Sequence, residues 1–326
     1  MSREAAPQVP GFRILRRLGA GSSGTVYHAI QDGTEREVAL KVFEPADDPD
    51  ATTPAQIERE REVAASLRHR HLARIHAMGE HGDRRWLASE YLAGGSLAER
   101  IAARMRVGEV LQVVRDVLQG LGHAHARGVV HGDVKPGNIL FRGAGDAVLV
   151  DYGIAAFARE GDRRVRMQGG TPEYMSPEQA RGEPVDGRSD FFSLGVVLHE
   201  MLTGRVPWPA DAGGEARDRG QAPLLPARHR WLQPLLDALL AERPEDRPED
   251  ARALLSLLSS LCAASPEAQS LLPHPGDDIE AGRVHGRYES VRARRRQLRR
   301  ASARALLVLA LVLIGAFLAT RLFAGD

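Results

Sequence analysis

Residues 130–140 read VHGDVKPGNIL and place an acid, a lysine and an amide within a few positions of one another. Apolar residues flank the stretch, which predicts a buried strand or helix end before it and a strand after it. Pro136 and Gly137 predict a turn between them. In a loop held by buried elements, Asp133 is suited to accept a proton, Lys135 to hold a phosphate oxygen and Asn138 to bind a metal. A polar surface turn is the competing interpretation of this stretch alone.

Length and composition narrow the class of protein. The chain has 326 residues, enough for two lobes with their own cores. Its net charge of +1 gives no general reason to expect nucleic-acid binding. Cys262 is the only cysteine, which excludes an internal disulfide and a cysteine-rich metal site. Residues 1–10 are polar, so no secretory signal is expected.

Lysine is rare in this chain. Lysine and arginine together number 44, and the only two lysines are Lys41 and Lys135. Arginine therefore supplies the general positive charge, and lysine remains where a compact ammonium on a flexible stem is needed. Both lysines fall inside candidate phosphate-binding motifs, which argues against chance retention.

The N-terminal part predicts strands around a glycine turn. Residues 12–43 read as a run of strands, and residues 18–27, LGAGSSGTVY, contain the pattern G-x-G-x-x-G. A strand-forming Thr-Val-Tyr follows the last glycine, whereas a dinucleotide-binding turn needs a helix there. Thr25 also stands where a P-loop has its lysine. We therefore expect two strands joined by a glycine turn whose backbone amides lie over phosphates.

A lysine interrupts the next apolar strand. Residues 37–43 read EVALKVF, and a buried lysine is costly unless it is paired. Residues 56–67 predict an amphipathic helix carrying Glu58, Glu60 and Glu62. Most of these glutamates are expected on a solvated face, and one of them is the candidate partner of Lys41.

A change from strand to helix periodicity marks a boundary between lobes. Residues 86–92, WLASEYL, predict a strand, and residues 93–96 predict a flexible joint with Ser96 as a helix N-cap. Residues 110–126 then predict a helix that stops at Gly128. His123 and His125 near its end are interpreted as packing histidines rather than a metal pair, because no carboxylate cluster adjoins them.

A second acid follows the central loop. Residues 147–153, AVLVDYG, predict a short strand that ends at Asp151. Together with Asn138 it offers two oxygen ligands, a sparse set that Mg²⁺ accepts when phosphates and waters complete its coordination.

Taken in order, these motifs resemble a bacterial eukaryotic-type serine/threonine protein kinase over residues 12–262. The resemblance implies an α+β bilobal fold, with a small β-rich N-lobe at 12–92 after an N-terminal tail at 1–11, and a larger helical C-lobe at 93–262. It also implies ATP and Mg²⁺ as cofactors, and proteins with serine or threonine hydroxyls as substrates.

The resemblance assigns roles to the central residues. Asp133 matches the catalytic base that orients the substrate hydroxyl, and Lys135 matches the lysine that steadies the transferred phosphoryl group. Asn138 and Asp151 match the Mg²⁺ ligands, and Lys41 matches the strand lysine that holds the α- and β-phosphates.

The resemblance also outlines a nucleotide site made of a flap, which is the glycine turn with its two strands, the strand that carries Lys41, and a hinge at residues 90–92. Glu60 is the best match for the partner of Lys41, with Glu58 and Glu62 as rivals, and Ser89 occupies the gatekeeper position. The implied nucleotide-binding residues are Leu18, Gly19, Ala20, Gly21, Ser22, Gly24, Val26, Ala39, Lys41, Glu60, Glu90, Leu92 and Leu140.

Residues 170–178, GTPEYMSPE, resemble the end of an activation segment. Thr171 within them joins the implied catalytic residues, and with Lys135 it favours serine or threonine over tyrosine as the acceptor. Asp190 resembles the acid that supports the catalytic loop, and Arg247 resembles the arginine that pairs with Glu178.

Two positions depart from the family pattern. Gly132 stands where the family has an arginine that grips a phosphorylated activation segment, and Tyr152 replaces a phenylalanine, so its hydroxyl needs a partner. Residues 154–170 contain no serine or threonine for such an arginine to read. The two absences agree, and we predict activity without phosphorylation in that segment.

The C-terminal part predicts a membrane anchor. After a linker at 263–304, which carries the basic run Arg292–Arg300, residues 305–320 contain no charge. At about 1.5 Å per residue this run is roughly 24 Å long, and it reaches the ~30 Å of a bilayer core if it extends to residue 323 with Arg321 snorkelling outward.

The flanking charges predict an orientation and a lipid partner. The arginines precede the span, so the kinase lobes are expected on the cytoplasmic face of the inner membrane, with anionic lipids near the basic run. Residues 324–326 form a short tail, and no external sensor domain is expected. A buried core helix is the competing interpretation of the span. A solvated basic tail or a nucleic-acid patch is the competing interpretation of the arginines.

Two other functional classes remain open. A membrane-anchored pseudokinase, which binds ATP or scaffolds partners without turnover, is compatible with the departures at Gly132 and Tyr152. A small-molecule phosphotransferase shares the His-Gly-Asp wording but does not explain residues 171–178 or Arg247. We expect no nucleic-acid partner, and association into a homodimer stays open.

Overall fold

The computed structural model describes residues 7–21, 24–43, 66–82, 84–151, 170–208 and 222–265. The chain divides into two compact units, Met1–Leu271 and Leu272–Asp326, and every described residue lies in the first.

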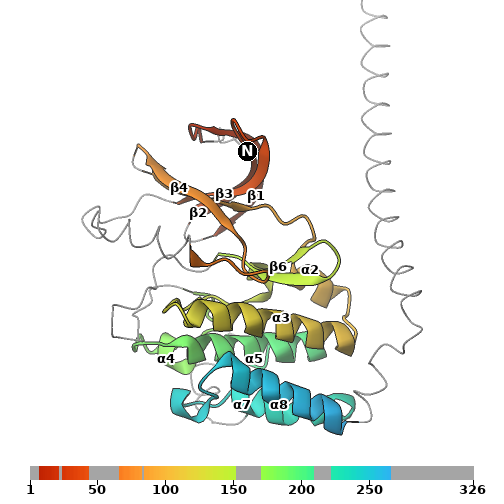
Figure 1. The fold of residues 1–326 in the computed structure, drawn as a ribbon. Coiled ribbons are helices and arrows are strands. Elements are labelled where there is room, and N and C mark those ends of the chain that lie inside the picture. Colours follow the sequence, from red (N-terminus) through yellow and green to blue (C-terminus); the bar gives the residue numbers. More distant parts are fainter. Residues whose placement is uncertain are drawn as a thin grey trace, which may run out of the picture. The chain divides into compact units, whose positions relative to one another are not determined.

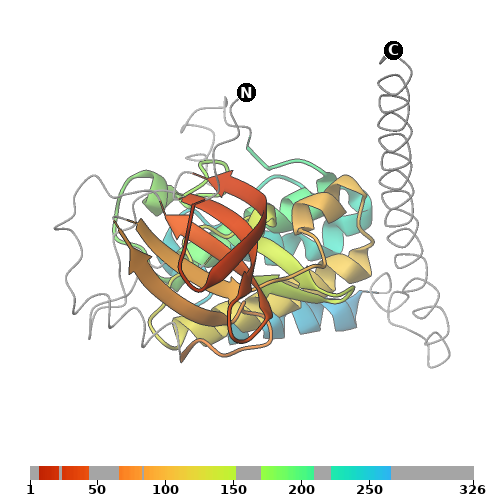
Figure 2. The ribbon, with the colours of Figure 1, turned by 90° about the horizontal axis from the view of Figure 1, so that it is seen from above.

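The N-terminal part of this unit is one antiparallel sheet, seen from two directions in Figures 1 and 2. Its strand order is β1-β2-β3-β5-β4. Side chains alternate between the faces of a strand, so β3 buries Val38, Leu40 and Val42 against Ala29 and Ala88. The strands are β1 (Phe12–Gly21), β2 (Gly24–Gln31), β3 (Arg36–Phe43), β4 (Ile75–His81) and β5 (Arg84–Glu90). The predicted run of strands over residues 12–43 is confirmed.

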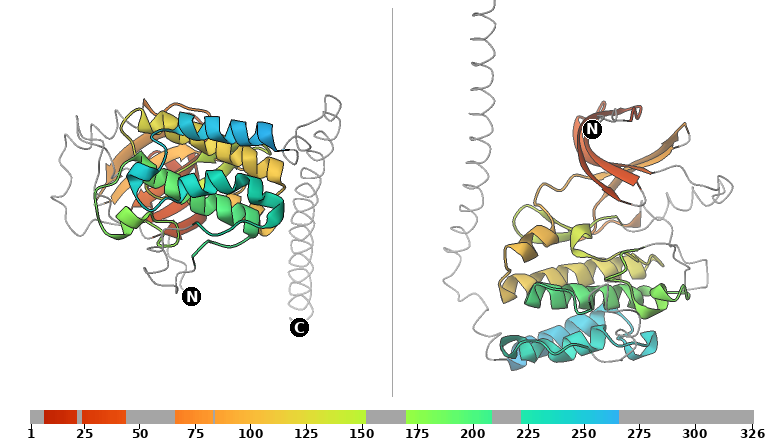
Figure 3. Two further views of the ribbon diagram at one scale, coloured as in Figure 1. Left: turned by 90° about the horizontal axis from the view of Figure 1, so that it is seen from below. Right: turned by 180° about the vertical axis from the view of Figure 1, so that it is seen from behind.

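Helices make up most of the rest of the unit, below the sheet in the view of Figure 1 and nearest the viewer in the left panel of Figure 3. A two-stranded hairpin, β6 with β7, lies among them. The elements are α2 (Leu97–Ala102), α3 (Val107–His125), η2 (Pro136–Asn138), β6 (Ile139–Arg142), β7 (Asp146–Leu149), α4 (Pro177–Ala180), α5 (Gly187–Thr203), η4 (Ala227–Leu232), α7 (Gln233–Leu239), η5 (Pro244–Asp246) and α8 (Ala251–Ala264). The expected division into a β-rich N-lobe and a helical C-lobe is confirmed.

Helix α3 is central to the C-lobe core and packs against β7, α5 and α8. Val114, Leu118 and Leu121 on its apolar face are completely buried. The helix predicted at 110–126 is present and begins three residues earlier, at Val107. Gly128 follows it with a φ of +72°, a conformation that glycine adopts without steric cost at a helix end.

The segment between the lobes is tied down, which corrects the prediction of a flexible joint at 93–96. The Gly94 amide donates to the Phe141 carbonyl at 2.9 Å, and the Phe141 amide donates to the Gly95 carbonyl at 3.0 Å. A Cβ on Gly94 would lie 2.0 Å from the Phe141 oxygen, so glycine serves close approach to β6 rather than flexibility. Ser96 caps α2 as predicted, in a capping box with Glu99.

Several predictions fall on residues outside those described. They are Ser22, the helix at 56–67 apart from its last two residues, Tyr152, residues 154–169, the linker beyond Ser265 and the apolar run at 305–323. Within the described ranges, no helix combines the length and hydropathy that a bilayer crossing requires. Helix α8 continues to Ala264, two residues past the predicted domain end at 262.

Candidate active site

The loop at residues 131–138 lies between two buried elements, as the sequence predicts. Helix α3 ends before it, and it closes in η2, directly before strand β6. The Val150 amide donates to the Asn138 carbonyl at 3.0 Å, and His131 Nε2 lies 3.1 Å from the Val150 carbonyl oxygen. These bonds, with the β6–β7 pairing, place Asp151 beside the loop.

Asp133, Lys135 and Thr171 meet at one point. Lys135 Nζ lies 2.6 Å from Asp133 Oδ2 and donates to the Thr171 hydroxyl at 2.5 Å. The Thr171 amide and hydroxyl both donate to Asp133 Oδ1, at 3.1 and 3.0 Å. The Asp133 and Lys135 side chains are each 28% exposed, so solvent or a substrate hydroxyl can reach them. A carboxylate that accepts a proton and an ammonium that stabilises negative charge are therefore adjacent.

A buried carboxylate, that of Asp190, binds the backbone of the loop at residues 131–138. Asp190, in the first turn of α5, is fully buried and accepts from the backbone amides of His131 and Gly132 at 2.9 and 2.7 Å. His125 Nε2 lies 2.7 Å from Asp190 Oδ2, the oxygen that also accepts from the His131 amide. Burial opposes ionisation, but the hydrogen bond from His125 and the nearby donors outweigh it and lower the pKa of Asp190. Asp190 is thus a charged support under the loop, and His125 is part of that support.

Asn138 and Asp151 form a pair of oxygen donors suited to a divalent cation. Asn138 Nδ2 donates to the carbonyl oxygen and to Oδ2 of Asp133, both at 2.9 Å, which turns its Oδ1 away from Asp133. Asp151 has a φ of +59°, a strained conformation that concentrates at functional sites. No group of three or more His, Cys, Asp or Glu within the described ranges could hold a metal. Asn138 and Asp151 are the described side chains that could hold an ion such as Mg²⁺, which takes few protein ligands when phosphates and waters supply the rest.

The partner of Lys41 in the structure is Asp151. Lys41 Nζ lies 3.1 Å from Asp151 Oδ2, and the two side chains are 14% and 34% exposed. The pairing that a buried lysine requires is thus supplied from the C-lobe. Glu58, Glu60 and Glu62 lie outside the described residues, so the predicted glutamate partner stays a prediction.

The glycine turn lies between β1 and β2, where Gly21 faces Gly24 in the strand register. A Cβ on Gly24 would lie 2.3 Å from the Val42 carbonyl oxygen, and its φ is +143°, so only glycine fits. Gly19 and Ala20 lie on β1 and pair with Val26 and Thr25 of β2. Leu18 is 38% exposed, and Val26 pairs with Lys41 on β3. Of the two implied flap strands, β2 pairs directly with the strand that carries Lys41, and β1 pairs with β2.

The predicted hinge is held by an arginine that sequence analysis missed. Arg142, at the end of β6, forms a bidentate ion pair with Glu90 at 2.8 and 2.9 Å and donates to the Arg70 carbonyl. Burial opposes ionisation of Glu90, but the hydrogen bonds from Arg142 prevail and lower its pKa. The Glu90 side chain is therefore committed to the fold, which leaves only its backbone for a nucleotide.

The rest of the hinge is packed on both sides. Leu92 is buried with Ala73 and Val148, and Leu140 packs against the same cluster. Ala39 pairs with Ser89 on β5.

Tyr91 links the hinge to the flap strands. Its ring stacks on His28 of β2 with the centroids 3.9 Å apart, and Arg16 of β1 donates to its hydroxyl at 3.0 Å. The flap strands are therefore fastened to the hinge.

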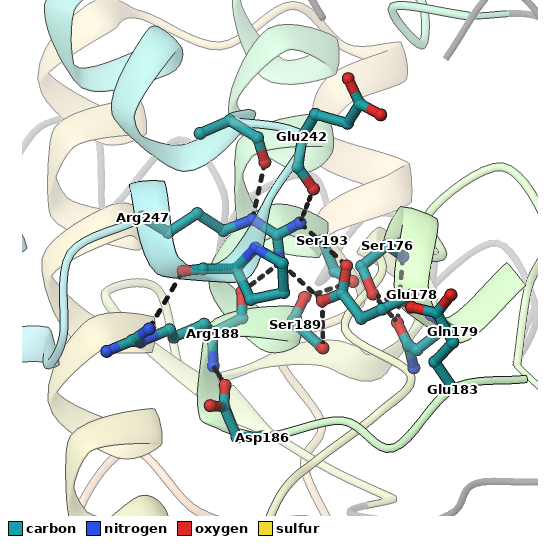
Figure 4. A network of polar contacts seen from close by, with 12 residues as sticks. Ser176, Glu178, Gln179, Glu183, Asp186, Arg188, Ser189, Ser193, Glu242 and Arg247 are labelled. Atoms are coloured by element: carbon teal, nitrogen blue, oxygen red, sulfur yellow. Dashed lines mark hydrogen bonds and ion pairs between the residues drawn. The ribbon is translucent and has the colours of Figure 1, made fainter. Parts of the chain in front are cut away.

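Residues 171–178, the segment expected to form the substrate platform, are anchored by a buried arginine (Figure 4). Arg247 donates to Glu178 Oε1 and Oε2 at 2.6 and 2.9 Å and to the carbonyl oxygens of Ala241, Glu242 and Arg188. All five guanidinium N–H groups are thus used. The predicted pair with Glu178 is present.

Comparisons with known proteins agree with this geometry. The family model described as a protein kinase domain matches residues 12–267. Serine/threonine-protein kinase pkn3 of Myxococcus xanthus is 34% identical over 271 residues, covering 77% of this chain and 50% of that protein. Serine/threonine-protein kinase PrkC of Bacillus subtilis (strain 168) is 34% identical over 225 residues, covering 68% of this chain and 34% of that protein. The chain thus spans half or less of the length of these two curated relatives.

A solved structure gives the same result at the level of the fold. The kinase domain of Mycobacterium tuberculosis PknI is 29% identical, with a TM-score of 0.63, and the match covers 80% of this chain and 100% of that one. Because the family model spans most of the sequence and the matched relatives are serine/threonine-protein kinases, this chain belongs to the protein kinase domain family.

Proposed function

We propose that this chain is a protein-serine/threonine kinase that transfers the γ-phosphoryl group of ATP to serine or threonine hydroxyls of proteins. The observation that carries the proposal is the Asp133 carboxylate, which contacts Lys135 at 2.6 Å and accepts two hydrogen bonds from Thr171. A base, a cation and the start of the substrate platform therefore meet where an acceptor hydroxyl has to lie.

The proposed reaction balances as follows. The acceptor hydroxyl oxygen bonds to the γ-phosphorus, the bond from phosphorus to the β–γ bridging oxygen breaks, and ADP leaves with that electron pair. The hydroxyl proton passes to the Asp133 carboxylate. Lys135 stabilises the negative charge of the transferred group, and Lys41 holds the α- and β-phosphates.

Asn138 and Asp151 would hold the divalent cation. Bound there, Mg²⁺ would neutralise the β- and γ-phosphate oxygens. Asn138 has a second role, because its Nδ2 orients the Asp133 carboxylate through the hydrogen bond at 2.9 Å.

Labelled ATP tests the proposal against its main alternative, an ATP-binding pseudokinase. We expect the wild type to label itself or a generic protein, and Asp133→Asn to lose about 10²-fold or more of that rate because the amide accepts no proton. ATP binding should persist in the variant. Lys41→Arg should also lose most activity, because the planar guanidinium cannot take the place of the ammonium. Wild type that binds ATP without phosphorylating anything would instead favour the pseudokinase, which the departures at Gly132 and Tyr152 motivate.

We further propose that activity does not need a phosphate on residues 154–170. Two sequence features support this: Gly132 offers no side chain to grip a phosphate, and the segment has no serine or threonine. We expect phosphatase-treated enzyme to keep its initial rate on a protein substrate. Phosphosite mapping of the active enzyme should find nothing essential in that segment, and an essential phosphate there would overturn the proposal.

Membrane attachment is the third part of the proposal. It is supported by the uncharged run at 305–320 and the preceding arginines. The full chain should float with vesicles of phosphatidylethanolamine and phosphatidylglycerol and resist extraction by alkaline carbonate. Protease added to inverted inner-membrane vesicles should digest the kinase domain. Recovery of the whole chain in the carbonate extract would contradict the span.

A further inference from the structure

One side chain joins the substrate platform to the catalytic loop. Gln179, in helix α4, donates its Nε2 to the Gly132 carbonyl oxygen at 2.9 Å, and this bond spans 47 residues of sequence. Its Oε1 accepts from the amide and hydroxyl of Ser176, at 3.0 and 3.1 Å, in the capping box of α4. The two ends of one amide thus hold the start of α4 and the residue before the catalytic base.

The peptide groups on both sides of Gly132 are held from outside the loop. Asp190 accepts the Gly132 amide at 2.7 Å, and Gln179 donates to the Gly132 carbonyl. The next amide, that of Asp133, donates to His131 Nδ1 at 3.2 Å. The plane of the peptide that leads into the base therefore depends on Gln179 and His131.

This external restraint matters because residue 132 is glycine. Gly132 has a φ of +74°, and glycine has more backbone freedom to lose than any other residue. Gly170, the residue before the platform, lies close to the same carbonyl, since a Cβ on Gly170 would lie 3.6 Å from the Gly132 carbonyl oxygen. No side chain at position 132 contributes to holding this arrangement.

We infer that Gln179 is a positioning residue for phosphoryl transfer, and that its hydrogen bond to Gly132 orients Asp133 without the need for a phosphate. The inference rests on the proposed kinase activity. It explains how a catalytic loop with Gly132 in place of an arginine is held to the platform by the resting chain itself.

Gln179→Glu tests the inference with little disturbance of the fold. Glutamate keeps an acceptor for Ser176, as a capping box allows, but its carboxylate donates nothing to the Gly132 oxygen. We expect kcat on a protein substrate to fall about 10-fold or more, because small misplacements of catalytic groups are costly. The KM for ATP should stay within about 2-fold and Tm within a few degrees, because neither the nucleotide contacts nor the helix cap changes.

Two further variants complete the experiment. Gln179→Met, which carries no charge and no donor, should lower kcat as Gln179→Glu does. Arg181→Gln changes the charge by the same amount as Gln179→Glu, on an exposed residue paired with Glu183, and should leave kcat unchanged. Wild-type kcat in Gln179→Glu, or a loss that appears only in Tm or in the KM for ATP, would overturn the inference. An inactive wild type would overturn the proposed function instead.

Discussion

At the scale of single residues, Gly132 shows how the catalytic loop tolerates its departure from the family pattern. Its φ of +74° lies in the left-handed region, where a side chain meets the following carbonyl oxygen. Both of its backbone polar groups are hydrogen-bonded, to Asp190 and to Gln179, so it cannot relax without losing a bond. Glycine at position 132 therefore lacks the arginine side chain of the family pattern but adopts the left-handed backbone conformation without strain.

Gly132→Ala should consequently lower the free energy of unfolding by about 1 kcal/mol, because alanine is strained in this conformation. Urea unfolding measures the change. Gly108→Ala is the matched control: Gly108 lies in helix α3, no atom comes within 4 Å of a Cβ there, and its φ is not positive. That variant should gain about 0.5 kcal/mol or more from helix propensity. Equal effects of the two substitutions would contradict the conformational explanation.

Arg247 shows what a planar fork does in a buried site. The Arg247 and Glu178 side chains are 0% and 2% exposed, and the guanidinium also serves three carbonyl oxygens. Lysine keeps the charge but cannot make two parallel bonds to a carboxylate. Arg247→Lys should leave buried acceptors unpaired, at a cost of roughly 2 kcal/mol or more.

Thermal unfolding checks this cost. Arg252→Lys is the control, because Arg252 is 89% exposed and its contact with Asp250 is a surface pair, which contributes little. Similar Tm values for the two variants would show that the fork at Arg247 is unimportant.

At the scale of elements, the start of α5 serves both the catalytic loop and the platform. Asp190 in its first turn supports the loop through two backbone amides. Ser189 donates to Glu178 at 2.5 Å, and the Arg188 carbonyl accepts from Arg247. The first turn of α5 therefore fixes the loop that carries Asp133 and residues 171–178 in relation to each other.

This arrangement predicts a specific weakness in acid. Burial opposes ionisation of Glu178, but the hydrogen bonds from Arg247 and Ser189 outweigh it, so its pKa in the folded chain is lowered from 4.5. The unfolded chain therefore binds a proton at this group more readily than the folded one. The stability that ionised Glu178 contributes is present above its unfolded pKa, near 4.5, and is lost as the pH falls through the lower folded pKa.

Glu178→Gln isolates this contribution from that of the other acids. At about pH 7 the variant should be less stable than the wild type by roughly 3 kcal/mol, because Arg247 is left buried without its counter-charge. The difference should begin to shrink as the pH falls below about 4.5, because the unfolded wild type then takes up a proton at Glu178 that the folded chain does not bind. It should be smallest below the folded pKa, where the carboxyl group is neutral in both states. Urea unfolding at a series of pH values measures the gap, and a gap that stays constant would contradict the assignment to Glu178.

At the scale of the whole molecule, the sequence predicted the helices and strands better than it predicted the contacts between them. The alternation of side chains along the segment was enough to predict β3, and the helical spacing of apolar residues was enough to predict α3. Both patterns lie within the segment itself. The resemblance to the kinase family put Asp133 and Thr171 in one group, but no local pattern predicted the hydrogen bonds between them. Arg142 with Glu90 and Gln179 with Gly132 were not foreseen, because these partners lie 52 and 47 residues apart and carry no local pattern. The S-x-x-Q spacing of a capping box was the one available pointer to Gln179.

Lys41 and Asp151 form one of the ion pairs that connect the two lobes. Lys41 comes from β3 of the N-lobe sheet, Asp151 follows β7 in the C-lobe, and their charged atoms lie 3.1 Å apart. Under the proposed function both groups face the triphosphate, one attracting its oxygens and the other repelling them unless a cation intervenes. Under this proposal, Asp151 would strengthen nucleotide binding when a metal is bound and weaken it when no metal is bound.

Removing the metal should accordingly affect the wild type and Asp151→Asn differently. Chelation should weaken ATP binding to the wild type by about 10-fold or more, or ~1.4 kcal/mol, because the carboxylate then faces phosphate oxygens directly. The affinity of Asp151→Asn should change by less than about 3-fold, and without metal this variant should bind ATP at least as tightly as the wild type does. Titration calorimetry with and without Mg²⁺ measures all four affinities. Asp146→Asn, which removes a surface pair with Arg70, should behave like the wild type. If Asp151→Asn and the wild type lost the same affinity on chelation, the carboxylate would not be the metal-dependent contact between nucleotide and C-lobe.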